Sequence, residues 1–248
     1  MAARDAAEAG AIEITTVNHH FYDSLWTTAR FVPPERFNTW PLVCELVAAS
    51  SARLEIGPGL HPRLPLAGTE FLDLSEPAVA ELTRRGGNAC VGSILALPHA
   101  DQAFDLVCAF DILEHVEDDH TAVAELHRVL RPGGTLLFSV PLYRAAWTEL
   151  DAVAGHYRRY EPGDLEALLG ARGFTIVQSA VYGMQPKSTR LLRWGLWWLK
   201  HHPSFAMRWF NGWLMPLGLW LQKPLVFAPG LSAAAGVDEI IAVAILSS

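Results

Sequence analysis

The sequence predicts a doubly wound α/β fold, with helices on both faces of a largely parallel sheet. Three observations lead to this prediction. The apolar run from Ala52 to Ile56 ends at two glycines, Gly57 and Gly59, which is typical of a buried strand that enters a tight turn. The run from Phe104 to Phe110 is almost entirely apolar after Asp105, as expected of a central parallel strand. Segments with helical apolar spacing separate these runs, so strands and helices alternate.

Capping residues and helix breakers set the expected boundaries. Ser75 precedes Glu76-Pro77 and Gly86-Gly87 follows, which predicts a helix between them. Pro132-Gly133-Gly134 ends a later helix. The expected helices are 41–50, 76–85, 118–129 and 163–171, and the expected strands are 52–56, 71–73, 88–92, 104–110, 135–140, 175–181 and 239–246.

Composition restricts the class of protein. The chain has 248 residues, enough for one large domain or one domain with an appendage, and 51% of them are apolar, so it is globular. Its net charge is −7 with only three lysines, which argues against a nucleic-acid partner. Cys44, Cys90 and Cys108 lack C-x-x-C spacing, so we expect neither a disulfide framework nor a metal site. The first residues lack the pattern of a secretory signal, and we expect a cytoplasmic protein.

The second strand supplies an acidic residue at an informative distance. Sixteen residues after Gly57, the apolar pair Phe71-Leu72 ends in Asp73. A carboxylate at this place can accept hydrogen bonds from both hydroxyls of a ribose. The glycine turn and Asp73 together predict a cofactor that contains a nucleoside.

Six motifs between Arg53 and about Val140 resemble those of the class I S-adenosylmethionine-dependent methyltransferases, in particular the broad group that acts on small molecules. The resemblance implies a Rossmann-like sheet of about seven strands with an antiparallel last strand, and S-adenosyl-L-methionine as cofactor. It says little about the methyl acceptor. The motifs are Glu55-Ile56-Gly57-Pro58-Gly59, Asp73, Leu97-Pro98, Phe104-Asp105-Leu106-Val107, Glu114-His115-Val116 and Leu130-Arg131-Pro132-Gly133-Gly134.

The resemblance also implies roles in cofactor binding. Glu55 would reach the amino group of the methionine part, directly or through water, and Asp73 the ribose. Ser93 stands where the family commonly has an aspartate beside the adenine, so its hydroxyl or the backbone of Ile94 would make that contact. Pro62 and Pro65 leave room for only a short helix after the glycine turn. The predicted cofactor-binding residues are Glu55, Gly57, Pro58, Gly59, Asp73, Leu74, Ser93, Ile94 and Phe110.

The loop after strand 135–140 carries the candidate catalytic residues. Methyl transfer needs the acceptor, methyl group and sulfur in line, and a base if the acceptor still carries its proton. His156 is the first candidate for this base and Tyr160 the second. Arg158 and Arg159 would clamp a carboxylate or phosphate, unless they pair with the acidic residues at 161 and 164 while His156 packs under the loop. The predicted substrate-binding residues are Tyr22, His115, Trp147, Arg158 and Arg159, although His115 would alternatively orient its loop.

Three parts of the chain are distinguished. Residues 1–50 form an N-terminal helical cap, which covers either the site or the sheet edge, and residues 51–183 and 237–248 form the methyltransferase domain. Residues 184–236 form an insertion with six of the nine tryptophans and two expected helices, 188–200 and 204–222. The insertion is interpreted as a lid, a homodimer surface or a membrane-facing helix. Its longest uncharged stretch, Trp209 to Gln222, is too short to span a bilayer and contains Pro216.

A site roofed by tryptophan and leucine favours an aromatic or lipid-like acceptor. The expected function is therefore methyl transfer to a small, largely apolar molecule. Two alternatives are a peripheral membrane enzyme that methylates a lipid or polyprenyl substrate, and a non-catalytic binding module of the same fold.

Overall fold

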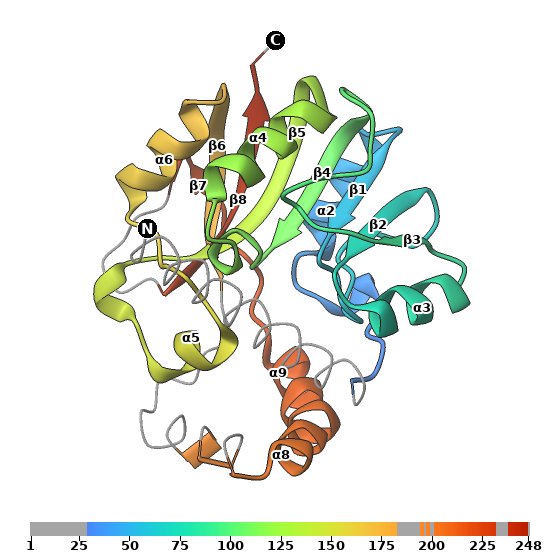
Figure 1. Ribbon diagram of the computed structural model, residues 1–248, viewed down its shortest axis with the longest axis vertical. Coiled ribbons are helices and arrows are strands. Elements are labelled where there is room, and N and C mark those ends of the chain that lie inside the picture. Colours follow the sequence, from blue (N-terminus) through green and yellow to red (C-terminus); the bar gives the residue numbers. More distant parts are fainter. Residues whose placement is uncertain (1–28, 183–193, 196, 199–200, 232–237, 248) are drawn as a thin grey trace, which may run out of the picture.

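The computed structural model describes residues 29–182, 194–195, 197–198, 201–231 and 238–247. One mixed sheet runs through the molecule, with helices on both of its faces (Figure 1). Its strand order is β3-β2-β1-β4-β5-β8-β6-β7. The strands are β1 Arg53–Ile56, β2 Thr69–Asp73, β3 Asn88–Val91, β4 Phe104–Phe110, β5 Leu130–Pro141, β6 Phe174–Tyr182, β7 Ala228–Pro229 and β8 Glu239–Leu246.

The pairing confirms the predicted doubly wound fold. Strands β1 to β5 pair in parallel, whereas β8 lies antiparallel between β5 and β6. The chain order reverses at β1, from which the strands proceed outward on one side through β2 and on the other through β4. In such sheets, ligands bind at the carboxyl ends of the strands near this reversal.

Helices cover the sheet because successive strand residues point to opposite faces. Val107 and Ala109 pack with helices α4 Asp119–Val129 and α6 Pro162–Gly170 on one face. Leu106 and Cys108 pack with α2 Trp40–Ala48 on the other face. The remaining elements are 3-10 turns η1 Pro34–Arg36, η2 Leu113–His115 and η3 Arg144–Ala146, and helices α3 Glu76–Arg84, α5 Glu149–Ala154, α8 Pro203–Trp209 and α9 Met215–Leu221, with a π-helical segment η4 Phe210–Leu214.

Two features of the sheet differ from expectation. Strand β5 begins at Leu130 rather than 135, because Leu130 pairs with Phe104 and the chain then bulges before Thr135 pairs with Leu106. Pro132-Gly133-Gly134 lies in this bulge, where Gly133 has a φ of 76°. The additional two-residue strand β7 pairs with β6 at the sheet edge. Both features depend on pairing between distant segments.

Pro62 and Pro65 predicted at most a short helix in the connection between β1 and β2, and the connection contains none. A buried side chain organises it instead. The Glu55 carboxylate accepts hydrogen bonds from the backbone N–H groups of Arg63 and Leu64, each at 2.8 Å. The glycine turn before it is tight: Gly57 has a φ of 66°, and a Cβ there would lie 2.2 Å from the Ile112 Cδ1 atom.

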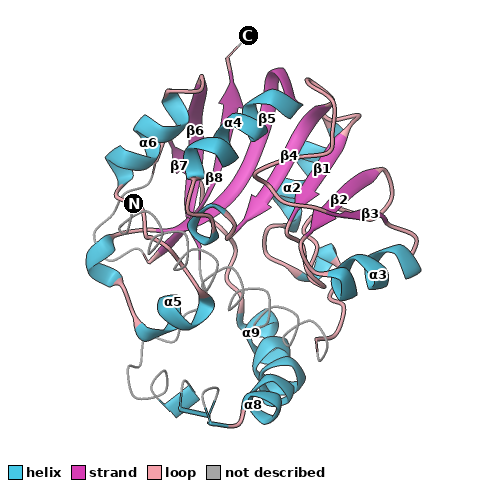
Figure 2. Cartoon of the chain, viewed as in Figure 1, coloured by secondary structure: helices cyan, strands magenta, loops and turns pink. Residues whose placement is uncertain are grey.

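The described part of the insertion forms α8, η4 and α9 beyond the carboxyl ends of the parallel strands (Figure 2). The π-helical turn directly precedes Pro216, which cannot donate a backbone hydrogen bond and crowds the turn before it. Asn38 ties the end of this helix to the domain, since its N–H donates to Gln222 Oε1 at 2.6 Å and its Nδ2 to the Lys223 carbonyl at 2.8 Å. Within the described ranges, no helix has the length and apolarity needed to cross a membrane.

Most of the predicted N-terminal cap and of the expected helix 188–200 lies outside the described residues.

Candidate functional site

The ends of β1 and β2 meet at Asp73. This buried carboxylate accepts a hydrogen bond from the Gly59 N–H through Oδ2 and from the Ser75 N–H through Oδ1, both at 2.8 Å. It therefore fixes the glycine turn against the second strand end. Its contact with the ribose hydroxyls of the cofactor stays a prediction.

Glu55 lies beside this turn but is directed at the β1–β2 connection. Burial raises its pKa to about 7, even though hydrogen bonds from the Arg63 and Leu64 backbone favour the ionised form. Its contact with the amino group of a methionine moiety stays a prediction.

Arg63 is a basic residue of this region that sequence reasoning missed. Its guanidinium carbon lies 3.5 Å from the centre of the Phe37 ring and 5.4 Å from that of Phe110, and its Nη2 donates to the Tyr182 hydroxyl at 3.0 Å. Its Nε and Nη1 atoms are buried and donate to no group in the described part of the chain. Except for His61, it is the only ionisable residue between Gly57 and Gly68, a signal visible in the sequence.

The other predicted cofactor residues line the neighbouring strand ends. Leu74 is 56% exposed directly after Asp73, a position where it can contact an adenine ring. Ser93 accepts a hydrogen bond from the Leu95 N–H at 3.2 Å, and Ile94 is buried. Phe110 is half-buried at the end of β4, 6.1 Å from the Tyr182 ring. Pro58 is buried within the glycine turn.

Buried acidic groups follow strand β4. Asp111 adopts a φ of 51°, which is uncommon for a residue other than glycine, and its carboxylate accepts a hydrogen bond from Ser139 Oγ at 2.7 Å. Burial raises the pKa of Asp111 and of Glu239, and the two carboxyl groups hydrogen-bond to one another. One shared proton between them accounts for this contact.

Glu114 and His115 occupy the η2 turn beyond Asp111. Glu114 is 1% exposed, and burial, reinforced by the negative charge of Asp111, raises its pKa well above the usual value. Burial, with a smaller electrostatic effect of the neighbouring His156, lowers the pKa of His115 to about 3. The His115 and His156 rings meet edge to face with their centres 4.5 Å apart.

His156 is oriented by a carboxylate. Its Nδ1 lies 3.0 Å from Asp151 Oδ1. Asp151 also accepts hydrogen bonds from Arg159 Nε at 2.9 Å and Nη2 at 3.0 Å, and from the Thr148 N–H at 2.6 Å. Burial alone would raise the pKa of Asp151, but its bonds to His156, Arg159 and Thr148 outweigh burial and hold the pKa well below its usual value. Asp151 therefore contacts Nδ1 of the His156 imidazole and leaves Nε2 as its other ring nitrogen.

The loop that carries His156 is attached to η2 and α4. The Tyr160 hydroxyl is buried 2.9 Å from Asp119 Oδ2, and burial raises its pKa well above the usual range. Arg158 pairs with Asp119 at 2.7 Å and donates to the Glu117 carbonyl. The Tyr157 N–H donates to the Glu114 carbonyl at 2.8 Å. These contacts favour positioning roles for Tyr160 and Arg158.

Arg159 and the remaining substrate candidates are dispersed. Arg159 is 1% exposed and directed at Asp151, which favours a structural role. The acidic residues considered as partners of the two arginines, Glu161 and Asp164, contact Arg144 instead. Trp147 is 42% exposed, and Tyr22 lies outside the described residues.

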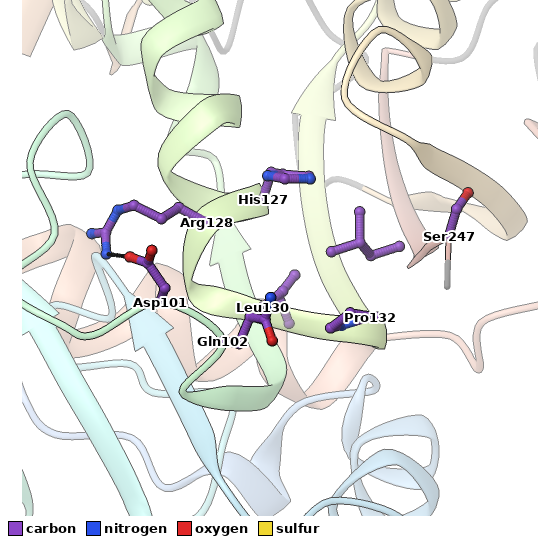
Figure 3. Close-up of a pocket in the computed structure, with 8 residues that line it drawn as sticks. Asp101, Gln102, His127, Arg128, Leu130, Pro132 and Ser247 are labelled. Carbon is purple, nitrogen blue, oxygen red and sulfur yellow. Dashed lines mark hydrogen bonds and ion pairs between the residues drawn. The ribbon is translucent and has the colours of Figure 1, made fainter.

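Two cavities lie at the opposite edge of the sheet. One has a volume of about 200 Å³, and Figure 3 shows the Arg128 guanidinium on its wall directed at Asp101. The other has a volume of about 380 Å³ and is lined by residues that include Arg53, Thr69 and Phe104, where β1, β2 and β4 begin. Because ligands of parallel sheets bind at the carboxyl ends of the strands, neither cavity is the expected cofactor site.

Comparison with known proteins agrees with this fold and site. Residues 56–138 match the family described as a methyltransferase domain. A probable S-adenosylmethionine-dependent methyltransferase of Mycolicibacterium smegmatis is 32% identical over 109 residues, 42% of each chain. The malonyl-[acyl-carrier protein] O-methyltransferase of Salmonella typhimurium is 33% identical over 118 residues, 44% of this chain and 47% of that protein. The chain thus aligns with less than half the length of these relatives.

Among solved structures, a possible histamine N-methyltransferase from Thermotoga maritima superimposes with a TM-score of 0.55 at 18% identity, over 93% of this chain and 100% of that one. The fold is that of the class I S-adenosylmethionine-dependent methyltransferases, and residues 56–138 carry a methyltransferase domain. These likenesses support S-adenosylmethionine as the cofactor.

Replacement of Asp73 by asparagine tests the cofactor site. The amide keeps the shape but loses the charge and one acceptor oxygen, so we expect the Kd for S-adenosylmethionine to rise about 10- to 100-fold. Isothermal titration calorimetry measures it, with Asp101→Asn at the opposite edge of the sheet as the matched control. An unchanged Kd for Asp73→Asn would remove this carboxylate from the cofactor site.

Proposed function

We propose that the protein transfers a methyl group from S-adenosylmethionine to a hydroxyl or carboxyl oxygen of a small, largely apolar acceptor. The observation that carries the proposal is the His156–Asp151 pair, a histidine oriented by a buried carboxylate at the edge of the sheet where the cofactor turn lies. An oriented imidazole is suited to accept a proton from the acceptor.

The reaction is a direct displacement. The acceptor oxygen forms a bond to the methyl carbon while the bond between that carbon and the sulfur breaks. The electron pair of the broken bond stays on the sulfur, which gives S-adenosylhomocysteine. Nε2 of His156 takes the acceptor proton. The Salmonella relative is named an O-methyltransferase, which supports an oxygen nucleophile.

Asp73, Glu55 and Arg63 each bind a different part of the cofactor. Asp73 binds the ribose hydroxyls, and Glu55 reaches the amino group of the methionine part directly or through water. Arg63 binds the carboxylate of that part, because its buried Nε and Nη1 lack a partner among the described residues and lie on the loop that Glu55 holds. The N–H groups of Nε and Nη1 point in different directions, so one carboxylate would satisfy one of these buried donors through a charge-assisted hydrogen bond.

A second candidate function is methylation of a lipid at a membrane surface. Trp213 and Trp220 of the insertion are 72% and 77% exposed, whereas Asn211 and Met215 are buried. Exposed tryptophans with flanking basic residues, here Arg208 and Lys223, are typical of helices that lie in the membrane interface. A homodimer would bury the same apolar surface.

The variant His156→Ala tests the catalytic assignment. Loss of a general base lowers turnover about 10²- to 10⁴-fold, and we expect little change in the Kd for S-adenosylmethionine. Turnover is measured as labelled methyl transferred to a small-molecule and lipid extract of the source organism. His120→Ala, an exposed histidine on α4, is the control. Wild-type turnover in His156→Ala would contradict the assignment.

The membrane candidate is tested by co-sedimentation with anionic phospholipid vesicles. We expect the wild type to pellet with the vesicles and the double variant Trp213→Ala with Trp220→Ala to stay largely in the supernatant, because the variant loses exposed apolar area. Val177→Ala, at an exposed position on β6, should pellet like the wild type. Wild-type protein that stays in the supernatant would exclude this candidate, and light scattering would then show whether a dimer covers the surface.

A further inference from the structure

Glu114, His115 and His156 form a cluster with the composition of a metal site. Each offers one ligand atom, a carboxylate oxygen or an imidazole nitrogen, and these three atoms lie within 4.8 Å of one another. Glu114 and His115 are adjacent on η2, whereas His156 follows α5. The cluster therefore exists only because the loop at 155–160 packs on η2.

Glu114 provides an independent indication of a ligand. The residue is 1% exposed, and apart from a weak interaction with its own backbone N–H, neither carboxylate oxygen has a hydrogen-bond partner among the described residues. Buried carboxylates are normally paired, hydrogen-bonded or bound to a metal, since an isolated buried charge is unfavourable. Glu114 is directed at the two imidazole rings, and a cation between them would neutralise it.

The surroundings of His156 also fit a ligand. Histidines that bind metals usually donate their second ring N–H to a carboxylate, which fixes the orientation of the ring. Asp151 stands in this position at 3.0 Å from Nδ1, and Arg159 anchors Asp151 from the other side. Nε2 of His156 therefore faces the cluster as a possible ligand atom.

Two imidazoles and one carboxylate suit a divalent transition-metal ion and leave coordination positions open. Bonds of about 2.1 Å place ligand atoms about 3 to 4 Å apart, so binding would draw these three together by about 1 Å. Both histidines are partly exposed, which gives an ion access from solvent. The sequence predicted no metal site, because its cysteines lack the spacing of metal ligands, but this cluster contains no cysteine.

We propose that Glu114, His115 and His156 bind one divalent transition-metal ion, with Zn²⁺ as the reference ion. The catalytic use of this ion rests on the proposed function, whereas the binding of the ion does not. The acceptor hydroxyl would occupy an open position and lose its proton to solvent, because a bound cation lowers the pKa of such a group. The resulting oxygen anion attacks the methyl carbon, and His156 then serves as a ligand instead of the base.

The test is metal binding by the full chain after removal of metal with a chelator. Calorimetric titration with Zn²⁺ should give one tight site per chain, and Co²⁺ should give the visible absorption of a site with nitrogen ligands. Zn²⁺ binding should be at least about 100-fold weaker in each of the variants Glu114→Gln, His115→Ala and His156→Ala. This effect exceeds that expected for a residue that only supports a metal ligand. His120→Ala and the double variant His201→Ala with His202→Ala, all exposed histidines, should bind like the wild type.

A thermal measurement guards against misfolded variants. Zn²⁺ should raise the Tm of the wild type but not that of Glu114→Gln, which retains the shape of the buried side chain. Equal Zn²⁺ affinity in the wild type and the three cluster variants, or no tight site in the wild type, would overturn the proposal.

Transfer assays separate this inference from the proposed function. Full methyl transfer in the presence of chelator would overturn the catalytic use of the ion and leave the base role of His156 standing. One bound ion without methyl transfer to any component of the extract would overturn the proposed function and leave the metal site standing.

Discussion

The buried pair of Arg159 and Asp151 holds the candidate site to the sheet. Both side chains are fully buried, with 2.9 Å between Arg159 Nε and Asp151 Oδ1. Arg159 Nη1 also donates to the carbonyls of Leu142 and Asp238, at the end of β5 and the start of β8. Asp151 in turn caps α5 and orients His156. Loss of either partner leaves an uncompensated buried charge, so loop, helix cap and imidazole depend on one interaction.

The electrostatics of the site favour cationic ligands. Asp111, Glu114 and Glu239 are acidic groups near the end of β4, and burial raises the pKa of each. Arg63 is a nearby cation that lowers the pKa of two of them, Asp111 and Glu239. The positive charge on the sulfonium of S-adenosylmethionine, and a metal ion at Glu114, would both be stabilised here. Burial disfavours the charge on these carboxyl groups, so a cation bound among them would favour their ionised forms and be stabilised by them in turn.

Local patterns predicted the fold, whereas long-range contacts decided much of the site. Apolar runs and breakers predicted most elements within a few residues, and the Gly57–Asp73 spacing predicted a cofactor turn. The bulge before Thr135 and strand β7 depend on pairing between distant segments. Arg63 lies against Tyr182, and Glu114 lies near His156. These neighbours are far away in the sequence, so no local pattern could reveal them. Tyr160 and Arg159 stood out as polar residues, but their sequence gave no indication that they would be buried.

A crystal structure with S-adenosylhomocysteine would show whether the cofactor lies across the carboxyl ends of β1, β2 and β4. We expect ribose hydroxyls within hydrogen-bond distance of Asp73, the amino-acid carboxylate on Nε or Nη1 of Arg63, which have no partner among the described residues, and the sulfur facing His156. Density for the ligand at another edge of the sheet, or an Arg63 without contact to the carboxylate, would contradict this expectation.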